Sequence, residues 1–162
     1  MIETKKEPVI MTDTEKLTSI IQHIKRVEDN CNIISRKMMD INPRFAIAIA
    51  KRGRIHDASK FDQLEFENLW VDSRLFTISL LHHHTNNSHH PEHYRNGIHG
   101  MSELDLAEMV ADCAARAQEF GKDVRIWFFS DDKAPKKYGY LGEQHIYDRL
   151  EYYVNMLLNT SF

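Results

Sequence analysis

The stretch LTSIIQHIKRVEDNCNIISRKM, residues 17–38, decides the fold, because its apolar side chains recur at alternating steps of three and four. These side chains are Leu17, Ile20, Ile24, Val27, Cys31, Ile34 and Met38. An α-helix has about 3.6 residues per turn, so this spacing places them in one stripe along a helix. His23 lies one turn before Val27, at the edge of the stripe. The stretch predicts a long amphipathic first helix.

The same helical period continues after this stretch, with start and stop signals between the segments. Asn42 followed by Pro43 is typical of a helix start, and the helix that they open should stop near Gly53. Asp62 with Glu65 three residues later resembles a capping box. This pair predicts a further helix, which runs to about residue 70.

The second half of the chain also reads as helices. Ser73 should cap a helix that runs into the triple histidine, and Ser102 with Asp105 should start another, which Gly121 ends. The predicted core stripe of that helix consists of Leu106, Met109, Val110, Cys113, Ala117 and Phe120. Residues 122–140 read as irregular, and a final helix turns Ile146, Leu150, Tyr153, Val154 and Leu157 inward. We expect five to seven helices with essentially no sheet, which is an all-α, single-domain bundle.

Length and composition indicate one domain and exclude some functions. The chain has 162 residues, 42% of them hydrophobic, which suffices for one core. We expect a flexible N-terminus over residues 1–13 and one helical domain over 14–160. A net charge of −3 lacks the basic excess of proteins that bind the phosphate backbone, so bulk nucleic-acid binding is not expected. No run approaches the roughly 20 apolar residues of a membrane span, and Cys31 and Cys113 read as reduced core residues, so we expect a cytoplasmic protein.

Histidine is the compositional anomaly of this chain. Of ten histidines, seven lie between residues 82 and 99, namely His82, His83, His84, His89, His90, His93 and His99. The segment NNSHHPEHYRNGIHG, residues 86–100, has no helical period and predicts a loop. A solvated polar loop is the ordinary explanation for such a segment, but a metal site explains better why so many imidazoles occur together. We expect the 82–99 stretch to lie beside the functional site, partly as a helix end and partly as a mobile lid.

An adjacent His56–Asp57 pair follows the second predicted helix. With a histidine upstream and an aspartate downstream, it combines imidazole nitrogen and carboxylate oxygen ligands. That mixture suits Mn, Fe, Zn, Co or Mg better than a metal that prefers thiolates. A helix-terminal pair that satisfies backbone groups is the structural alternative for such a doublet.

Four motifs together resemble the HD-domain superfamily of metal-dependent phosphohydrolases, in which a His, a His-Asp pair, further His residues and a distal Asp follow in that order. The motifs are HIKRV from His23, HDASKF from His56, LHHHTNNSHHPEHY from Leu81 and EMVADCAA from Glu108. They cover about residues 17–128. The chain is also similar to an uncharacterised family of HD-like proteins from phage and bacterial genomes. The resemblance implies an HD-like helical bundle around a metal site.

The resemblance implies a specific ligand set for one or two divalent ions. The superfamily's core ligands match His23, His56, Asp57 and Asp112. Positions that hold a second metal in some members match His83 and His90, or their neighbours His82 and His89. Successive residues of a helix point about 100° apart, so the three histidines at 82–84 cannot all face one ion.

Asp57, Lys60 and Arg116 are the candidate catalytic residues. Asp57 could orient the attacking water, and Lys60, three residues later, could contact a phosphate oxygen, although a surface lysine is an equal alternative. Asp112 shares a helix face with other charged residues, namely Asp105, Glu108, Arg116 and Glu119. Such a face is ordinarily a charged exterior. With Asp112 as a ligand, Glu108 and Arg116 would instead support the ligands or face the substrate.

The leading hypothesis is a phosphohydrolase that acts on a small phosphate ester, with a nucleotide as first candidate, through metal-activated water. The alternative is a non-catalytic HD-like module that binds a nucleotide or a protein partner. A nuclease of the His-Asn-His type, suggested by the cluster at residues 86–90, needs a strand pair that the helical period does not predict. A homodimer is left open. For the aromatic residues between 127 and 140, core packing is favoured over a base-stacking pocket.

Overall fold

The computed structural model describes residues 10–70 and 74–159, which form eight α-helices and three short 3₁₀ helices. No β-strand occurs in these residues, so the predicted all-α class is confirmed, with one α-helix more than the predicted range. The predicted flexible segment 1–13 lies mostly outside the described residues, and the first helix begins at Asp13. No helix in the described ranges combines the length and apolar character that a membrane crossing needs.

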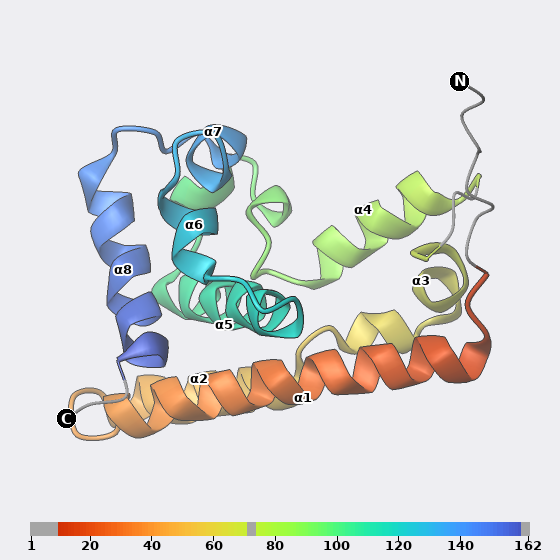
Figure 1. Cartoon of the computed structure of the whole chain (residues 1–162), viewed down its shortest axis with the longest axis horizontal. Helices are drawn as coiled ribbons and strands as arrows, with labels where there is room; N and C mark the ends of the chain where they lie inside the picture. The colour runs from red at the N-terminus through yellow and green to blue at the C-terminus, as the bar shows by residue number, and fades with distance from the viewer. Residues whose placement is uncertain (1–9, 71–73, 160–162) are drawn as a thin grey trace.

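Helices α1 and α2 pair along one side of the molecule (Figure 1). Helix α1 spans Asp13–Met38 and starts with a capping box between Thr12 and Glu15. Helix α2 spans Pro43–Ile55, and the Asn42 side chain accepts a hydrogen bond from the Phe45 amide at 3.1 Å, as its predicted N-cap role requires. The predicted stop near Gly53 is confirmed, since α2 ends at Ile55, although Gly53 itself lies buried inside the helix.

Gly53 is required for the close approach of α2 to α1. A Cβ at this position would lie 2.7 Å from Cys31 Cβ and 3.2 Å from Glu28 Cα. Neither atom is the end of a flexible side chain, so the helices themselves would have to move apart. We therefore expect Gly53→Ala to lower the free energy of unfolding by about 1–3 kcal/mol, despite the better helix propensity of alanine. A denaturant melt of the variant beside the wild type measures this, and an increased stability would contradict the close packing.

Four helices lie over the C-terminal half of α1, on the left of Figure 1, and two of them, α5 and α8, pack on α1 directly. Helix α5 spans Glu103–Glu119, and its capping box of Ser102 and Asp105 is confirmed. Residues 122–140, predicted to be irregular, contain α6 at Val124–Phe129 and α7 at Ala134–Tyr138, and α8 follows at Gln144–Leu158. Helices α6 and α7 are too short to show an apolar period. The burial of their apolar side chains stabilises them instead. The Tyr140 hydroxyl donates to the Phe128 carbonyl at 2.8 Å, and both side chains are fully buried.

The hydrophobic core lies between α1, α2, α5, α6 and α8. Its fully buried members include Val27, Cys31, Ile34, Ile49, Leu106, Val110, Phe128, Tyr140, Leu150 and Val154. The predicted inward face of α8 is thus confirmed, as is that of α1 from Ile20 onward, whereas Leu17 is 42% exposed. Phe128 and Tyr140 pack in the core as favoured. Phe120 departs from the predicted stripe of α5, since 66% of it is exposed. It follows the last helical residue, where the chain no longer keeps the phase of the helix.

The N-terminal half of α1 is covered by a smaller lobe, formed by α3 at Gln63–Asn68 and α4 at Phe76–Asn86 (Figure 1). The predicted capping box of Asp62 and Glu65 is wrong, because the Asp62 side chain makes no cap bond and Glu65 is fully buried. The predicted cap Ser73 lies outside the described residues. Three 3₁₀ helices connect the lobes: η1 at Ala58–Phe61, η2 at Pro91–His93 and η3 at Gly97–Gly100.

Candidate metal centre

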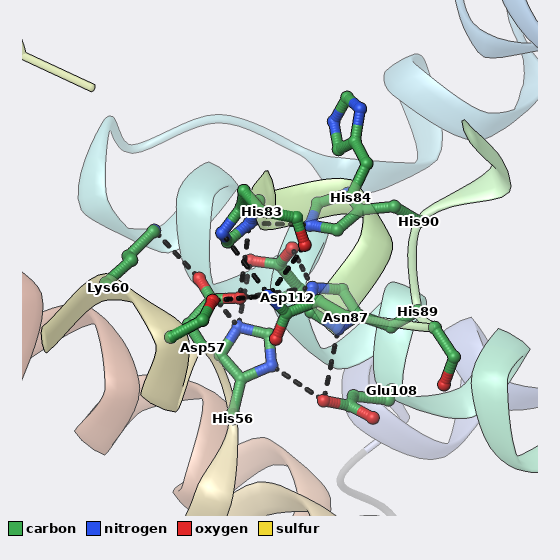
Figure 2. Close-up of polar contacts among 12 residues, drawn as sticks. His56, Asp57, Lys60, His83, His84, Asn87, His89, His90, Glu108 and Asp112 are labelled. Carbon is green, nitrogen blue, oxygen red and sulfur yellow. Dashed lines mark hydrogen bonds and ion pairs between the residues drawn. The ribbon is translucent and has the colours of Figure 1, made fainter. Parts of the chain in front are cut away.

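The chain turns sharply at His56 and Asp57, directly after α2. Asp57 has φ 54° and ψ 25°, and it is the one non-glycine residue with a positive φ in the described chain. Aspartate tolerates this left-handed conformation better than most residues because it is short and unbranched at Cβ. Both side chains are almost fully buried and face the space between α1, α4 and α5 (Figure 2). The turn therefore delivers an imidazole and a carboxylate to one point.

The first candidate ligand group contains His23 from α1, His56 and Asp112 from α5. Asp112 Oδ1 lies 2.9 Å from His23 Nε2 and 3.6 Å from His56 Nε2. Asp57 completes the group, because its Oδ2 lies 3.4 Å from His56 Nε2 and 3.9 Å from His23 Nε2. Two imidazole nitrogens and two carboxylate oxygens thus converge, although Asp57 lies just after α2 and Asp112 lies far along the chain in α5.

The second candidate group contains Asp57 again, with His83 from α4 and with His89 and His90 from the segment after it. Asp57 Oδ1 lies 3.4 Å from His89 Nε2 and 3.5 Å from His83 Nε2. The Nε2 atoms of His83 and His90 are 3.0 Å apart. One ligand atom from each of the four residues lies within 4.8 Å of every other.

The two aspartates connect the two groups. Asp57 turns Oδ2 to the first group and Oδ1 to the second. Asp112 does the same, with Oδ1 beside His23 and Oδ2 3.5 Å from His89 Nε2. The arrangement is therefore one continuous cluster, in which each carboxylate has one oxygen for either side.

Two buried glutamates orient the histidines from outside the cluster, and Figure 2 shows one of them, Glu108, beside His56 and His89. Glu108 Oε1 accepts from His56 Nδ1 at 2.8 Å and lies 3.2 Å from His89 Nδ1. Glu65 accepts from His83 Nδ1 at 2.9 Å and from His82 Nδ1 at 2.6 Å. A bond from Nδ1–H leaves Nε2 with its lone pair toward the centre, which is the tautomer that a metal-binding histidine needs.

Arg52 in turn holds Glu108 in place. Its Nε donates to Glu108 Oε2, and its Nη2 donates to Asp105 Oδ1 and to Ser88 Oγ, each at 2.8 Å. Asp105 also accepts from the Tyr94 hydroxyl at 2.6 Å. These bonds lower the pKa of Asp105 to about 2, although burial alone would raise it. The network ties α2, α5 and the loop after α4 together, so the ligand positions depend on all three.

The charges of the cluster favour a cation. Burial lowers the pKa of His23 and of His83, and burial with the neighbouring His89 lowers the pKa of His90 to about 2, so their lone pairs are free at neutral pH. Burial also acts on His56, but the charge of Asp57 and bonds to the surrounding carboxylates outweigh it and raise the pKa of His56 well above its usual value. The centre thus carries surplus negative charge, which protons or a metal ion can neutralise.

Several atoms that face the centre lack hydrogen-bond partners among the residues that the structure describes. His56 Nε2, His89 Nε2 and Asp57 Oδ1 are buried and unsatisfied. A buried polar atom without a partner is costly, and most such atoms in proteins are satisfied by a bond, water or an ion. The mixed nitrogen and oxygen set fits a divalent cation. These buried His, Asp and Glu groups could therefore hold a metal ion.

The cluster opens into a cavity of about 1030 Å³. Lys60 lines it beside the centre, with Nζ 2.7 Å from Asp57 Oδ2. Arg116 lines it one turn after Asp112 on α5, is 45% exposed, and pairs with Glu119 at 3.1 Å. Both predicted supporting cations thus face the cavity, and Lys60 is the one that contacts the cluster.

The structure brings all six predicted metal ligands together. It also brings in His89, which the sequence left as an alternative ligand to His90, and it assigns Glu65 and Glu108 to the outer contacts. His82 lies outside the cluster on Glu65, and His84 points away from it (Figure 2). The predicted place of the 82–99 stretch beside the site is confirmed by His89 and His90, whereas its role as a mobile lid stays a prediction. No signal in the sequence marks Glu65, because its contacts to α4 span 17 and 18 residues.

Comparisons with known proteins add a family but no activity. No curated protein and no solved structure matches the chain significantly. Among models of protein families, one described as a family of unknown function, DUF5662, matches residues 12–156. That match covers α1 through most of α8 and includes every residue of the cluster. The chain therefore belongs to the DUF5662 family.

Proposed function

We propose that this protein is a metal-dependent phosphohydrolase that acts on a small phosphate ester. The observation that carries the proposal is the double role of Asp57 and Asp112, each of which offers one oxygen to either group of imidazoles. Carboxylates that face two neighbouring cation positions are typical of enzymes that use paired metal ions in phosphate chemistry. One or two ions of Mn, Fe, Zn, Co or Mg suit the donor set.

Divalent ions bound there would supply Lewis acidity, which makes water a nucleophile at neutral pH and neutralises charge on phosphoryl oxygens. The chain's own residues would position the substrate. Lys60 Nζ lies at the edge of the cluster and can donate to a phosphate oxygen, while Arg116 faces the same cavity from α5. Asp57 is buried among the cluster with a lowered pKa, so it stays ionised and serves as a ligand rather than as a general base.

Membership of the HD-domain superfamily is part of this proposal. The order of the clustered residues along the chain, His23, then His56–Asp57, then the histidines after α4, then Asp112, supports it. The nuclease alternative has no such support, since it needs a strand pair and residues 74–159, where its histidines lie, contain no strand. Asn86 and Asn87 instead donate to the His82 and His83 carbonyls at the end of α4.

Hydrolysis of phosphate monoesters by the manganese-loaded protein tests the proposal, with Lys60→Gln as the diagnostic variant. We expect measurable turnover, and a loss of about 10²-fold in kcat/KM for Lys60→Gln, because it removes one donor to the phosphoryl group. Metal content should stay unchanged, because Lys60 is not among the candidate ligands. Lys51→Gln, on the exposed side of α2, is the matched control and should keep full activity. A metal-loaded protein without hydrolysis of any monoester would favour the binding module instead.

A further inference from the structure

The cavity beside the metal centre is much larger than a phosphate group needs. From His23, Asp57 and Asp112 it continues between the α3–α4 lobe and the end of α5 with α6. Its volume of about 1030 Å³ is that of a site for a whole organic ligand. The lining of the part farthest from the cluster therefore bears on what the phosphate is attached to.

The cations of the cavity suit the phosphate. Lys60 and Arg116 lie toward the cluster, and Lys122 and Lys133 also line the cavity. Apart from the two ligand aspartates, the described lining contains one carboxylate, that of Asp123. This carboxylate is already engaged, since it accepts from the backbone amide and the guanidinium of Arg125. The cavity is thus suited to an anionic group at the metal end.

The remaining wall is apolar and partly aromatic. It consists of Leu69, Trp70, Phe76, Leu80, Ala117, Phe120, Val124, Ile126 and Trp127. Three of these are notably exposed for their type: Phe120 by 66%, Ile126 by 57% and Phe76 by 38%. Large apolar side chains gathered at the mouth of a cavity cost free energy in water, which a bound apolar group would recover.

Neutral amide and hydroxyl side chains are missing from the described part of this wall. Among the described lining residues there is no Asn, Gln, Ser, Thr, Tyr or Glu. A nucleobase and a ribose carry many donors and acceptors, and sites that select such groups bond them with matched polar side chains. A nucleoside here would meet charged side chains, those of Lys122, Asp123 and Lys133, and an apolar wall, so many of its polar groups would lack matched partners, at a cost in binding free energy.

We propose that the cavity binds the organic group of a phosphate monoester of an apolar alcohol, with the phosphate toward the metal centre and the alkyl or aryl group against the apolar wall. The inference rests on the proposed function for the position of the phosphate. It replaces the nucleotide, which was the first candidate substrate from the sequence, by a substrate class that the lining matches.

Direct binding tests this inference without any catalytic step. Hexylphosphonate and methylphosphonate share the anionic head and differ in the length of the alkyl chain, and both tryptophans of the protein, Trp70 and Trp127, line the cavity. Titration of each phosphonate into the manganese-loaded protein, followed by tryptophan fluorescence, gives the two dissociation constants. We expect hexylphosphonate to bind about 100-fold tighter or more, because the added methylene groups leave water. Adenosine monophosphate should bind more weakly than hexylphosphonate.

Exposed members of the wall supply the variants, since their replacement does not disturb the core. Phe120→Ser and Ile126→Ser should each weaken hexylphosphonate binding about tenfold and leave methylphosphonate binding unchanged. Ile47→Ser, at a residue of α2 that is 51% exposed and outside the cavity lining, is the matched control. Equal affinities for the two phosphonates, tighter binding of adenosine monophosphate, or no binding of hexylphosphonate would each overturn the inference.

The result that would contradict the proposed function differs from the results that would contradict the cavity assignment. If hexylphosphonate binds as expected but no phosphate monoester is hydrolysed, the cavity assignment stands and the hydrolase proposal falls. If monoesters are hydrolysed with equal kcat/KM for hexyl phosphate and a short-chain ester, the hydrolase proposal stands and the apolar substrate class is wrong.

Discussion

Replacing Asp57 by Asn is expected to abolish metal binding while the helical fold persists. Asp57 is 2% exposed, and its two oxygens contact both groups of imidazoles. Neutral imidazoles give a divalent ion no net charge compensation, so the carboxylates contribute strongly to holding it. Asn has the same shape and tolerates the left-handed backbone of this position, so the substitution removes the charge without a change of turn. Alanine would add strain of about 1 kcal/mol or more.

Elemental analysis and thermal melts measure the effect. After dialysis with manganese we expect one or two ions per wild-type chain and close to none for Asp57→Asn. Manganese should raise the Tm of the wild type, since binding at about 100-fold over Kd adds roughly 2.7 kcal/mol to the free energy of unfolding. The Tm of Asp57→Asn should not respond. His93→Asn, at an exposed histidine outside the candidate groups, serves as the control and should behave as the wild type.

Two outcomes would contradict this expectation. Full metal occupancy of Asp57→Asn would show that the ion lies elsewhere in the chain. A wild type that binds no divalent metal at all would leave the cluster with a purely structural role, and the hydrolase proposal would lose its chemical basis.

Replacing Glu108 by Gln should weaken metal binding about 10–100-fold, although Glu108 need not contact the ion. Its two oxygens face three donors, namely His56 Nδ1, His89 Nδ1 and Arg52 Nε. A glutamine amide has one oxygen, so its NH₂ group would face at least one of these N–H groups. With the amide oxygen toward Arg52, His56 and His89 would lose the bonds that hold Nε2 toward the centre, and with the oxygen toward the histidines, Arg52 would no longer hold the side chain in place. The free energy of unfolding should also fall by about 1–3 kcal/mol, because a buried donor is left without an acceptor.

Metal titration by calorimetry and a denaturant melt of the metal-free protein separate the two effects. Glu119→Gln is the matched control on the same helix, because Glu119 forms an exposed pair with Arg116 and touches no histidine. We expect it to change neither the metal affinity nor the stability measurably. A Glu108→Gln variant with wild-type metal affinity would show that His56 and His89 are oriented without this carboxylate.

Features of this protein that depend on residues close together in the chain can be predicted from the sequence. The alternating steps of residues 17–38 place one stripe on α1, and the caps at Asn42 and Ser102 start α2 and α5 where predicted. The all-α class follows from the same local period. His56 and Asp57 were identifiable as a pair because they are adjacent, and Asp112 because its motif resembles a known metal site.

Which histidines and carboxylates meet depends instead on how helices far apart in the sequence pack together. His82, His83 and His84 are equivalent in the sequence, and the phase of α4 against Glu65 and Asp57 turns His83 alone into the cluster. Glu108 and Asp112 lie on a face that reads as a charged exterior, yet Arg52, His56 and His89 cover it from α2 and from the loop after α4. These contacts join residues many positions apart, and chain packing sets them. No local period encodes such pairs, which is why the contact of Glu65 with His83 appears only in the folded chain, and why the choice between His89 and His90, which both enter the cluster, could not be made from the sequence.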